Sequence, residues 1–333
     1  MPDVKPLDRN SRVYIAGHNG LAGSAIWRAM EADGFTDLVG ARSSEVDLRD
    51  RAATFAYLHQ IQPDVVVLAA ARVGGIVAND TYPAEFLSEN LRIQVNVMDS
   101  AQDVGVDRLL FLGSSCIYPK FAEQPIKESS LLTGELEPTN DAYAVAKIAG
   151  IMQVRAARKQ YAVHWISAMP TNLYGPGDNF DLTTAHVLPA LVRKISEAQE
   201  RGLSQVTLWG SGLPLREFLH ADDLGRAVAS LLDAYDGSQP INVGSGHEVS
   251  IKNLSDMVAR ALQYDGLIEF DMTKPDGTPR KLLDSSQIRR LGWTPRVSLT
   301  EGIHDTIKSF QHDKGAAGCA ESQRQLQGSE DSL

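Results

Sequence analysis

The stretch RVYIAGHNGLAGSAIW, residues 12–27, decides the fold. Its first five residues predict a β-strand, and a glycine turn follows at once, before a helix expected over residues 20–33. Glycine lets the backbone turn tightly, so that a pyrophosphate can approach the amides and the dipole of the helix N-terminus. On the first strand of a β-α-β series, such a turn predicts a dinucleotide site. We expect the whole turn to contact the cofactor, through Gly17, His18, Asn19, Gly20, Leu21, Ala22 and Gly23.

Strand and helix patterns alternate through the first two-thirds of the chain. The run DVVVLA, residues 64–69, is almost continuously apolar, which suits a central parallel strand covered on both faces. This alternation indicates a doubly wound parallel sheet, so the predicted fold class is α/β of the Rossmann type. Further strands are expected at 38–41, 108–113 and 163–168, and helices at 50–60, 84–103 and from 138 to about 160.

The pattern loosens after about residue 178, where a smaller mixed α/β domain is expected. Residues 1–180 with about 218–243 are predicted to form the dinucleotide-binding domain, and residues 181–217 with 244–313 the substrate domain. The polar stretch 314–333 has no aromatic residue and predicts a disordered tail. The expected helices here are 186–199, 222–235, 251–263 and 299–311, and the expected short strands are 206–209, 217–220, 241–243 and 267–270.

Composition limits the classes of partner. The 333 residues carry a formal net charge of −10, which argues against nucleic acid, because phosphate backbones recruit basic surfaces. The longest apolar run, residues 65–71, is far shorter than the roughly 20 residues of a membrane span. The N-terminus has no apolar stretch of the kind a signal peptide needs, and two cysteines cannot form a disulfide framework. We expect a cytoplasmic protein with no membrane partner and no metal.

The end of the second expected strand indicates which dinucleotide binds. An acidic residue there would bind the ribose 2′-hydroxyl, whereas a basic residue would meet a 2′-phosphate. The segment offers Arg42 and two serines, and no carboxylate before Glu45. This favours NADP(H), with Asp47 and Leu48 placed at the adenine edge.

A tyrosine and a lysine are spaced for carbonyl chemistry. Tyr143 and Lys147 are four residues apart, about one helical turn, and therefore share a face. A neighbouring lysine lowers the pKa of a phenol, which makes tyrosine a usable proton donor to a carbonyl under reduction. Ser114 follows the expected strand 108–113, at the sheet edge where ligands bind, and is placed to hydrogen-bond the same carbonyl oxygen.

Several longer segments carry a resemblance. The glycine spacing, the serine-tyrosine-lysine set and the order of elements resemble the extended short-chain dehydrogenases/reductases, and over about residues 10–312 the chain is similar to the GDP-L-fucose synthase family. The segments that carry this similarity are AAARVGGIVAND (69–80), FLGSSCIYPK (111–120), EPTNDAYAVAKIAG (137–150), MPTNLYGPGDNF (169–180), AHVLPAL (185–191), LWGSGLPLREFLH (208–220) and KPDGTPRKLLD (274–284).

The resemblance implies an epimerase-reductase acting on GDP-4-keto-6-deoxy-D-mannose. Cys116 and His186 would be the base and acid that invert C3 and C5, and NADPH would then reduce the C4 ketone, with Tyr143 as proton donor, to give GDP-β-L-fucose. No Asp or Glu lies between Ser114 and Phe121, which argues against water elimination. Implied cofactor contacts are Ala70, Leu112, Gly113, Ser115, Lys147, Pro170, Thr171, Asn172, Leu173 and His186; implied substrate contacts are Asn179, Val187, Lys194, Trp209, Arg216, Asp276 and Lys281.

Alternatives stay open at this point. Family members often carry a basic residue where this chain has Asn19, which weakens the preference for NADPH over NADH. A related nucleotide-sugar epimerase or 4-ketoreductase is a second candidate. A non-enzymatic NADP-binding regulator is a third, although it would not need to keep Ser114, Tyr143 and Lys147. The resemblance also implies a homodimer formed through the helices at 84–103 and 138–160.

Overall fold

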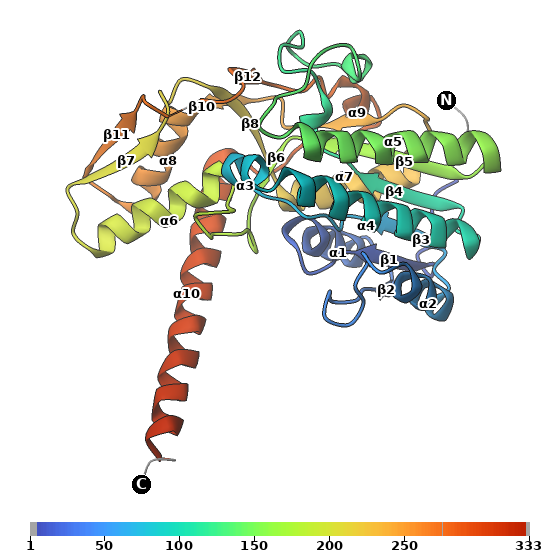
Figure 1. Cartoon of the computed structure of the whole chain (residues 1–333), viewed down its shortest axis with the longest axis horizontal. Coiled ribbons are helices and arrows are strands. Elements are labelled where there is room, and N and C mark those ends of the chain that lie inside the picture. The colour runs from blue at the N-terminus through green and yellow to red at the C-terminus, as the bar shows by residue number, and fades with distance from the viewer. Residues whose placement is uncertain (1–4, 275, 331–333) are drawn as a thin grey trace.

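The computed structural model describes residues 5–274 and 276–330. Its centre is a six-stranded parallel sheet in the order β2-β1-β3-β4-β5-β9 (Figure 1). The predicted Rossmann-type α/β fold is therefore confirmed. All four residues of β3 are buried between β1 and β4, as the apolar run predicted. The strands are β1 (Arg12–Ala16), β2 (Asp37–Val39), β3 (Val65–Leu68), β4 (Arg108–Leu112), β5 (His164–Pro170) and β9 (Ile241–Val243).

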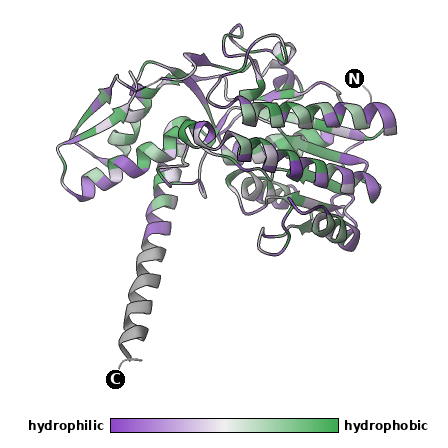
Figure 2. Cartoon of the chain, in the orientation of Figure 1, coloured by the Kyte–Doolittle hydropathy of each residue, from purple (hydrophilic) through white to green (hydrophobic). Residues whose placement is uncertain are grey.

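Helices cover both faces of this sheet. On one face, α1 (Leu21–Ala32) and α7 (Ala221–Ala234) bury residues such as Ile26 and Val228 against the strands. On the other face, α2 (Arg51–Ile61), α4 (Pro83–Asp103) and α5 (Asp141–Tyr161) enclose a second core. Figure 2 shows the strands of the sheet as strongly hydrophobic, while hydrophilic residues gather on the outer helical surfaces.

A smaller sheet stands beside the first. It holds β10 (Glu248–Ser250), β8 (Leu215–His220) and β12 (Arg280–Lys281), and β6 (Asn172–Tyr174) also pairs with β8. A separate parallel pair joins β7 (Gln205–Trp209) to β11 (Leu267–Asp271). Helices α6 (Val187–Glu200), α8 (Ile251–Leu262) and α10 (Leu299–Glu330) pack around a third core. The remaining helices are α3 (Ile76–Thr81), α9 (Ser286–Arg290), η1 (Ser115–Ile117) and η2 (Glu128–Ser130).

Two details differ from the sequence-based expectations. Ile288 and Trp293, which lie in the stretch assigned to the substrate domain, pack into the core formed by α1 and α7. The helix expected at 299–311 continues as α10 to Glu330, into the stretch for which a disordered tail was predicted. Its alanines, glutamates and glutamines favour helix without needing an apolar core. Residues 331–333 lie outside the described part of the chain, and disorder of the tail stays a prediction. No helix in the described residues is long and apolar enough to cross a membrane.

Candidate active site

The glycine turn brings β1, α1 and the loop after β3 into close contact. Gly17 has a φ of +85°, a conformation that side chains disfavour, and a Cβ there would lie 2.8 Å from the Ala70 backbone. A Cβ at Gly23 would overlap the Gly17 carbonyl. Gly20 caps α1 and has no side chain to accept from the first-turn amides, which therefore stay available to an anion. This cradle fits the pyrophosphate of a dinucleotide.

The end of β2 gathers the residues expected at the ribose. Arg42 is exposed, and its backbone amide donates to Glu45 Oε2 over 2.7 Å. The imidazole of His18 lies against Gly40, where a Cβ would overlap the ring. Burial lowers the pKa of His18, the Glu45 carboxylate raises it, and the Arg42 guanidinium lowers it. The net effect is a lowered pKa for His18, and a contact of Arg42 or His18 with a 2′-phosphate stays a prediction.

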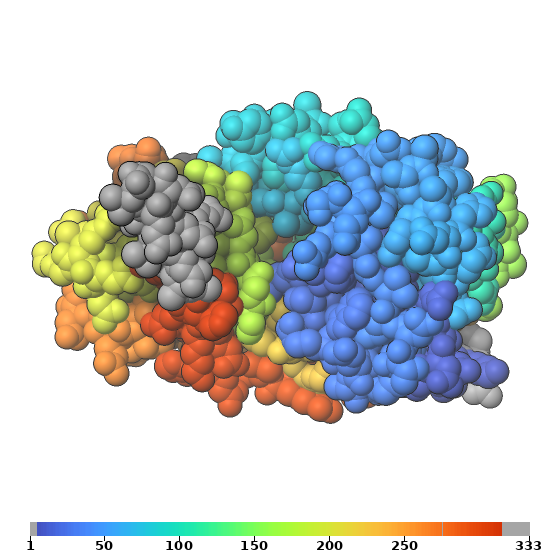
Figure 3. All heavy atoms as spheres, turned by 90° about the horizontal axis from the view of Figure 1, so that it is seen from below, coloured from blue at the N-terminus to red at the C-terminus, as the bar shows by residue number. Residues whose placement is uncertain are grey.

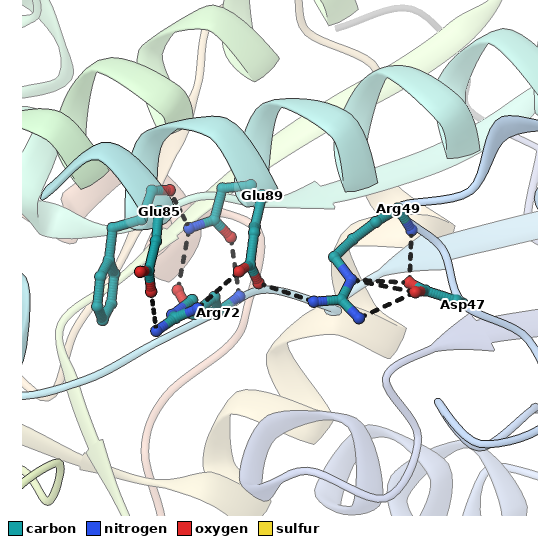
Figure 4. Close-up of polar contacts among 7 residues, drawn as sticks. Asp47, Arg49, Arg72, Glu85 and Glu89 are labelled. Carbon is teal, nitrogen blue, oxygen red and sulfur yellow. Dashed lines mark hydrogen bonds and ion pairs between the residues drawn. The ribbon is translucent and has the colours of Figure 1, made fainter. Parts of the chain in front are cut away.

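The expected adenine edge is tied to neighbouring elements. Arg49 holds the Asp47 carboxylate through ion-pair hydrogen bonds as short as 2.9 Å, and these bonds lower the pKa of Asp47. Asn96 of α4 donates to the Leu48 carbonyl over 3.0 Å. Arg49 also pairs with Glu89 of α4 over 3.3 Å (Figure 4), so the segment 47–49 is fixed against α4.

The other predicted cofactor residues lie at the carboxyl ends of β4 and β5. Leu112 ends β4, and Gly113 donates its amide to the Ala168 carbonyl over 2.9 Å. Ser115 begins η1 and is buried. Pro170 ends β5, Thr171 bonds to Val243 of β9, and Asn172 and Leu173 lie in β6. The structure thus gathers these predicted contacts along one edge of the sheet.

Lys147 is buried and turned toward β4. Its Nζ donates to the Leu112 carbonyl over 2.8 Å and lies 5.8 Å from the centre of the Tyr143 ring. Burial lowers the pKa of Lys147 to about 7. A lysine with this pKa carries only part of its charge near neutral pH.

Tyr143 does not show the lowered pKa that the sequence predicted. Burial raises the pKa of its phenol, the charge of Cys116 raises it further, and only the hydrogen bond with Ser114 lowers it. The prediction was wrong for this state because Lys147 is bonded to the Leu112 carbonyl and is itself deprived of charge by burial. A protonated Tyr143 is nevertheless the form that donates a proton.

Cys116 is surrounded by hydrogen-bond donors. Its amide donates to Ser114 Oγ over 3.2 Å, and Asn140 Nδ2 donates to the sulfur over 3.2 Å. Lys281 Nζ lies 3.6 Å from the same sulfur. Burial raises the pKa of the Cys116 thiol, but the Lys281 charge and the hydrogen bonds from Ser114, Lys281 and Asn140 outweigh it, so that the pKa is lowered overall. The site therefore favours a thiolate.

His186 stands at the N-terminus of α6, apart from this cluster. It is the N-cap residue and is exposed, and the surrounding protein atoms, which displace water, lower the pKa of its imidazole. No hydrogen bond joins it to Cys116 or Tyr143 in the part of the chain that the structure describes. Figure 3 shows the blue N-terminal part and the yellow-to-red C-terminal part meeting at a recess.

The predicted substrate residues lie on the C-terminal part. Trp209 is 56% exposed, and the ammonium groups of Lys194 and Lys274 each lie 5.6 Å from its ring centre. Burial lowers the pKa values of Lys194 and Arg216. Val187 begins α6. Asn179, another predicted substrate residue, donates its side-chain amide to Thr184 Oγ1 over 2.7 Å.

Asp276 is engaged within the protein. Its carboxylate accepts from the amide and the hydroxyl of Ser211, each over 2.7 Å, and so fixes the loop after β7. The sequence predicted a contact between Asp276 and the nucleotide, which stays a prediction. Sequence reasoning missed Asn140, although the residue lies within a segment that carried the resemblance, because its contact with the sulfur depends on where η1 places Cys116.

Comparisons with known proteins agree with this architecture. Residues 13–244 match the family model described as the NAD dependent epimerase/dehydratase family. The chain is 54% identical over 299 residues to GDP-L-fucose synthase 1 of Arabidopsis thaliana, a match that covers 90% of this chain and 93% of that protein. It is 47% identical over 308 residues to GDP-L-fucose synthase of Escherichia coli K12, covering 90% of this chain and 96% of that protein. The chain belongs to the GDP-L-fucose synthase family.

A solved structure of this family has the same fold. The crystal structure of a GDP-L-fucose synthetase from Naegleria fowleri bound to NADP matches with a TM-score of 0.87 at 28% identity, and covers 95% of this chain and 98% of that one. The resemblance drawn from the sequence is thus confirmed. The structure of this chain brings Ser114, Cys116, Tyr143 and Lys147 together at the carboxyl end of β4.

Proposed function

We propose that this protein converts GDP-4-keto-6-deoxy-D-mannose into GDP-β-L-fucose by C3/C5 epimerisation followed by NADPH-dependent reduction at C4. The observation that carries the proposal is the joint position of a cysteine whose thiol pKa is lowered and a tyrosine whose phenol pKa is raised, both in contact with Ser114. One carbonyl-binding position between these side chains serves both steps, because the ketone first acidifies its neighbouring protons and is then reduced.

The residues of the glycine turn and the end of β2 fit the cofactor. NADPH, when bound, supplies the hydride. The first-turn amides of α1 would hold the pyrophosphate, and Arg42 with His18 would meet the 2′-phosphate. Ala70, Gly113 and Thr171 would line the path from the turn to the site.

Epimerisation needs a base, an acid and a stabilised enolate. The Cys116 thiolate removes the proton next to the ketone, and the Ser114 and Tyr143 hydroxyls donate to the oxygen on which charge develops. His186, which is exposed, would return a proton from the other face. In the reduction Tyr143 would protonate the C4 oxygen, and Lys147 would hold the nicotinamide ribose if its ammonium turned away from the Leu112 carbonyl.

The nucleotide would bind on the C-terminal part. Trp209 offers an exposed ring for the base, and Lys194, Arg216 and Lys281 gather positive charge in an otherwise acidic protein. We further infer a cytoplasmic homodimer that buries the outer faces of α4 and α5, where Val95 and Val145 are exposed. Light scattering tests the dimer, and Val145→Glu should yield a monomer.

The function is tested by following NADPH oxidation with GDP-4-keto-6-deoxy-D-mannose and identifying the product. Wild type should give GDP-L-fucose, whereas Cys116→Ser should reduce the ketone without inverting C3 and C5. Absence of NADPH oxidation by wild type would overturn the assigned substrate, and other nucleotide sugars, then NADH, would be tried. Binding of NADP⁺ without turnover of any of these substrates would favour a regulator.

A further inference from the structure

The loop of residues 69–75, AAARVGG, lies between the cofactor turn and both groups of catalytic side chains. It leaves the end of β3 and starts with Ala69, whose amide donates to the Ala16 carbonyl over 3.1 Å. Its next residue, Ala70, packs directly on Gly17. Its far end reaches the segment that precedes His186. The loop therefore touches the parts of the chain that the proposed reaction must align.

Arg72 clamps this loop to α4. Its guanidinium pairs with Glu89 over 2.6 Å and with Glu85 over 2.7 Å, and it stacks 5.2 Å above the centre of the Phe86 ring (Figure 4). The backbone is fixed as well: Arg72 donates its amide to Asn90 Oδ1 over 2.9 Å, and Asn90 Nδ2 donates back to the Arg72 carbonyl over 3.0 Å. Asn90 is buried, so these bonds are shielded from water.

The side chain of Phe86 connects Arg72 to Tyr143. Phe86, under the Arg72 guanidinium, meets the Tyr143 ring edge to face, with the ring centres 6.5 Å apart. A Cβ at Gly74 would lie 3.0 Å from the Phe86 ring, so the loop also presses on Phe86 from its own side. The ring that supports Tyr143 is thus itself held on two sides.

The other end of the loop leads to His186. Gly75 donates its amide to the Thr184 carbonyl over 2.9 Å, and a Cβ at Gly75 would lie 2.6 Å from the Ala185 carbonyl oxygen. Asn79, which is buried, holds the Gly74 and Gly75 carbonyls from the inside over 2.7 and 3.0 Å. Residues 184–185 therefore pack against Gly75. They directly precede His186, the N-cap residue of α6.

We propose that the loop of residues 69–75 sets the positions of Tyr143 and His186 separately, so that Arg72 is a positioning residue for the reduction step and Gly75 for the epimerisation step. Neither residue touches the reacting atoms. This inference rests on the proposed function, in which Tyr143 transfers a proton only in the reduction and His186 transfers one only in the epimerisation. Displacements well below the size of an atom are enough to slow a step that depends on alignment.

The test measures the two steps apart. Deuterium uptake from D₂O at C3 and C5 of the 4-keto sugar, with NADP⁺ in place of NADPH, reports epimerisation, and single-turnover NADPH oxidation reports reduction. Arg72→Met should slow reduction about tenfold to a hundredfold and change deuterium uptake much less. Gly75→Ala should do the reverse. Arg72→Lys, which can pair with only one of Glu85 and Glu89, should recover part of the reduction rate.

Arg51→Met is the matched control. Arg51 also stacks on a phenylalanine, 4.2 Å from the Phe55 ring centre, and pairs with a carboxylate of α4, Asp99, over 2.8 Å, but it does not contact the loop. It should leave both rates unchanged. Thermal melting and NADP⁺ binding check that each variant is folded. Equal slowing of both steps by Arg72→Met and by Gly75→Ala, or slowing of neither, would overturn the inference, whereas a wild type that performs neither step would overturn the proposed function instead.

Discussion

Cys116 lies within reach of two side chains from distant parts of the chain, Asn140 at the start of α5 and Lys281 in β12. The sequence assigned Lys281 to the substrate, and the structure places its ammonium beside the sulfur. A cation at this distance favours thiolate, against a burial that disfavours it. The reactivity of Cys116 is thus a property of the contact with Lys281 as much as of the cysteine.

Lys281→Met should therefore raise the pKa of the Cys116 thiol, because burial then acts with less opposition. Alkylation by iodoacetamide at pH 7 should become about tenfold slower, and its pH profile should move to higher pH. The experiment uses a Cys319→Ser background, so that one thiol reacts. Arg280→Met is the control, since Arg280 pairs with Glu248 over 2.8 Å. Unchanged alkylation in Lys281→Met would refute the assignment.

Lys147 should make stability depend on pH. Burial lowers the pKa of Lys147 to about 7, whereas an unfolded lysine titrates near about 10.4. Between these values unfolding takes up a proton, so the free energy of unfolding increases as pH rises. Its contribution is about 1.4 kcal/mol per pH unit, and Lys147→Met lacks it. Urea unfolding of wild type and Lys147→Met, both without cofactor, from about pH 7.5 to about pH 9 measures how the free energy of unfolding changes with pH. The same pH dependence in both proteins would contradict a buried Lys147 with a lowered pKa.

At the scale of elements, α1 and α7 approach so closely that side-chain size at one position controls the contact. Gly225 of α7 faces the α1 backbone, and a Cβ there would overlap the Ala25 carbonyl. Glycine inside a helix is otherwise unfavourable by about 1 kcal/mol relative to alanine. Glycine at position 225 is unfavourable for the helix itself, but it allows α1 and α7 to pack closely.

Gly225→Ala should accordingly destabilise the protein, although helix propensity alone predicts the opposite sign. Overpacking a rigid backbone contact typically costs about 1–3 kcal/mol. Ser230→Ala, in the same helix and half-buried, provides a control in which propensity acts without a clash. Thermal unfolding compares the two, and a stabilised Gly225→Ala variant would show that the helices can separate at no cost.

The sequence predicted elements best where one pattern dominates. The apolar run of β3 and the glycine turn before α1 were found because burial on both faces and a tight turn leave clear signals. Strand β12 was missed: residues 274–281 contain Pro and Gly and resemble a loop, and Arg280 and Lys281 form a strand only by pairing with β8. Likewise the direction of Lys147, toward Leu112, depends on packing that spacing along a helix does not contain.

At the scale of the whole molecule, β8 connects the two parts of the fold. Its Glu217 is fully buried, and its carboxylate accepts from the Gly246 amide over 2.6 Å and from the Leu283 amide over 3.0 Å. One side chain thereby fixes the loop after β9 of the large sheet and the chain just after β12. Because Leu283 closely follows Lys281, the same contact supports the ammonium beside Cys116.

Glu217→Ala should lower the free energy of unfolding by about 1–3 kcal/mol for each amide left unpaired. Glu248→Ala is its control on the adjacent strand, because removal of the surface pair with Arg280 should cost at most about 1 kcal/mol. Glu217→Gln, which keeps one acceptor oxygen, should fold better and still show slower Cys116 alkylation, as the segment carrying Lys281 is held less firmly. Urea unfolding and iodoacetamide kinetics give the two readouts. If Glu217→Ala were no less stable than Glu248→Ala, the buried Glu217 carboxylate would not join the two parts of the fold. If Glu217→Gln lost stability but kept the wild-type alkylation rate, the Glu217 contacts would not affect the Cys116 thiol.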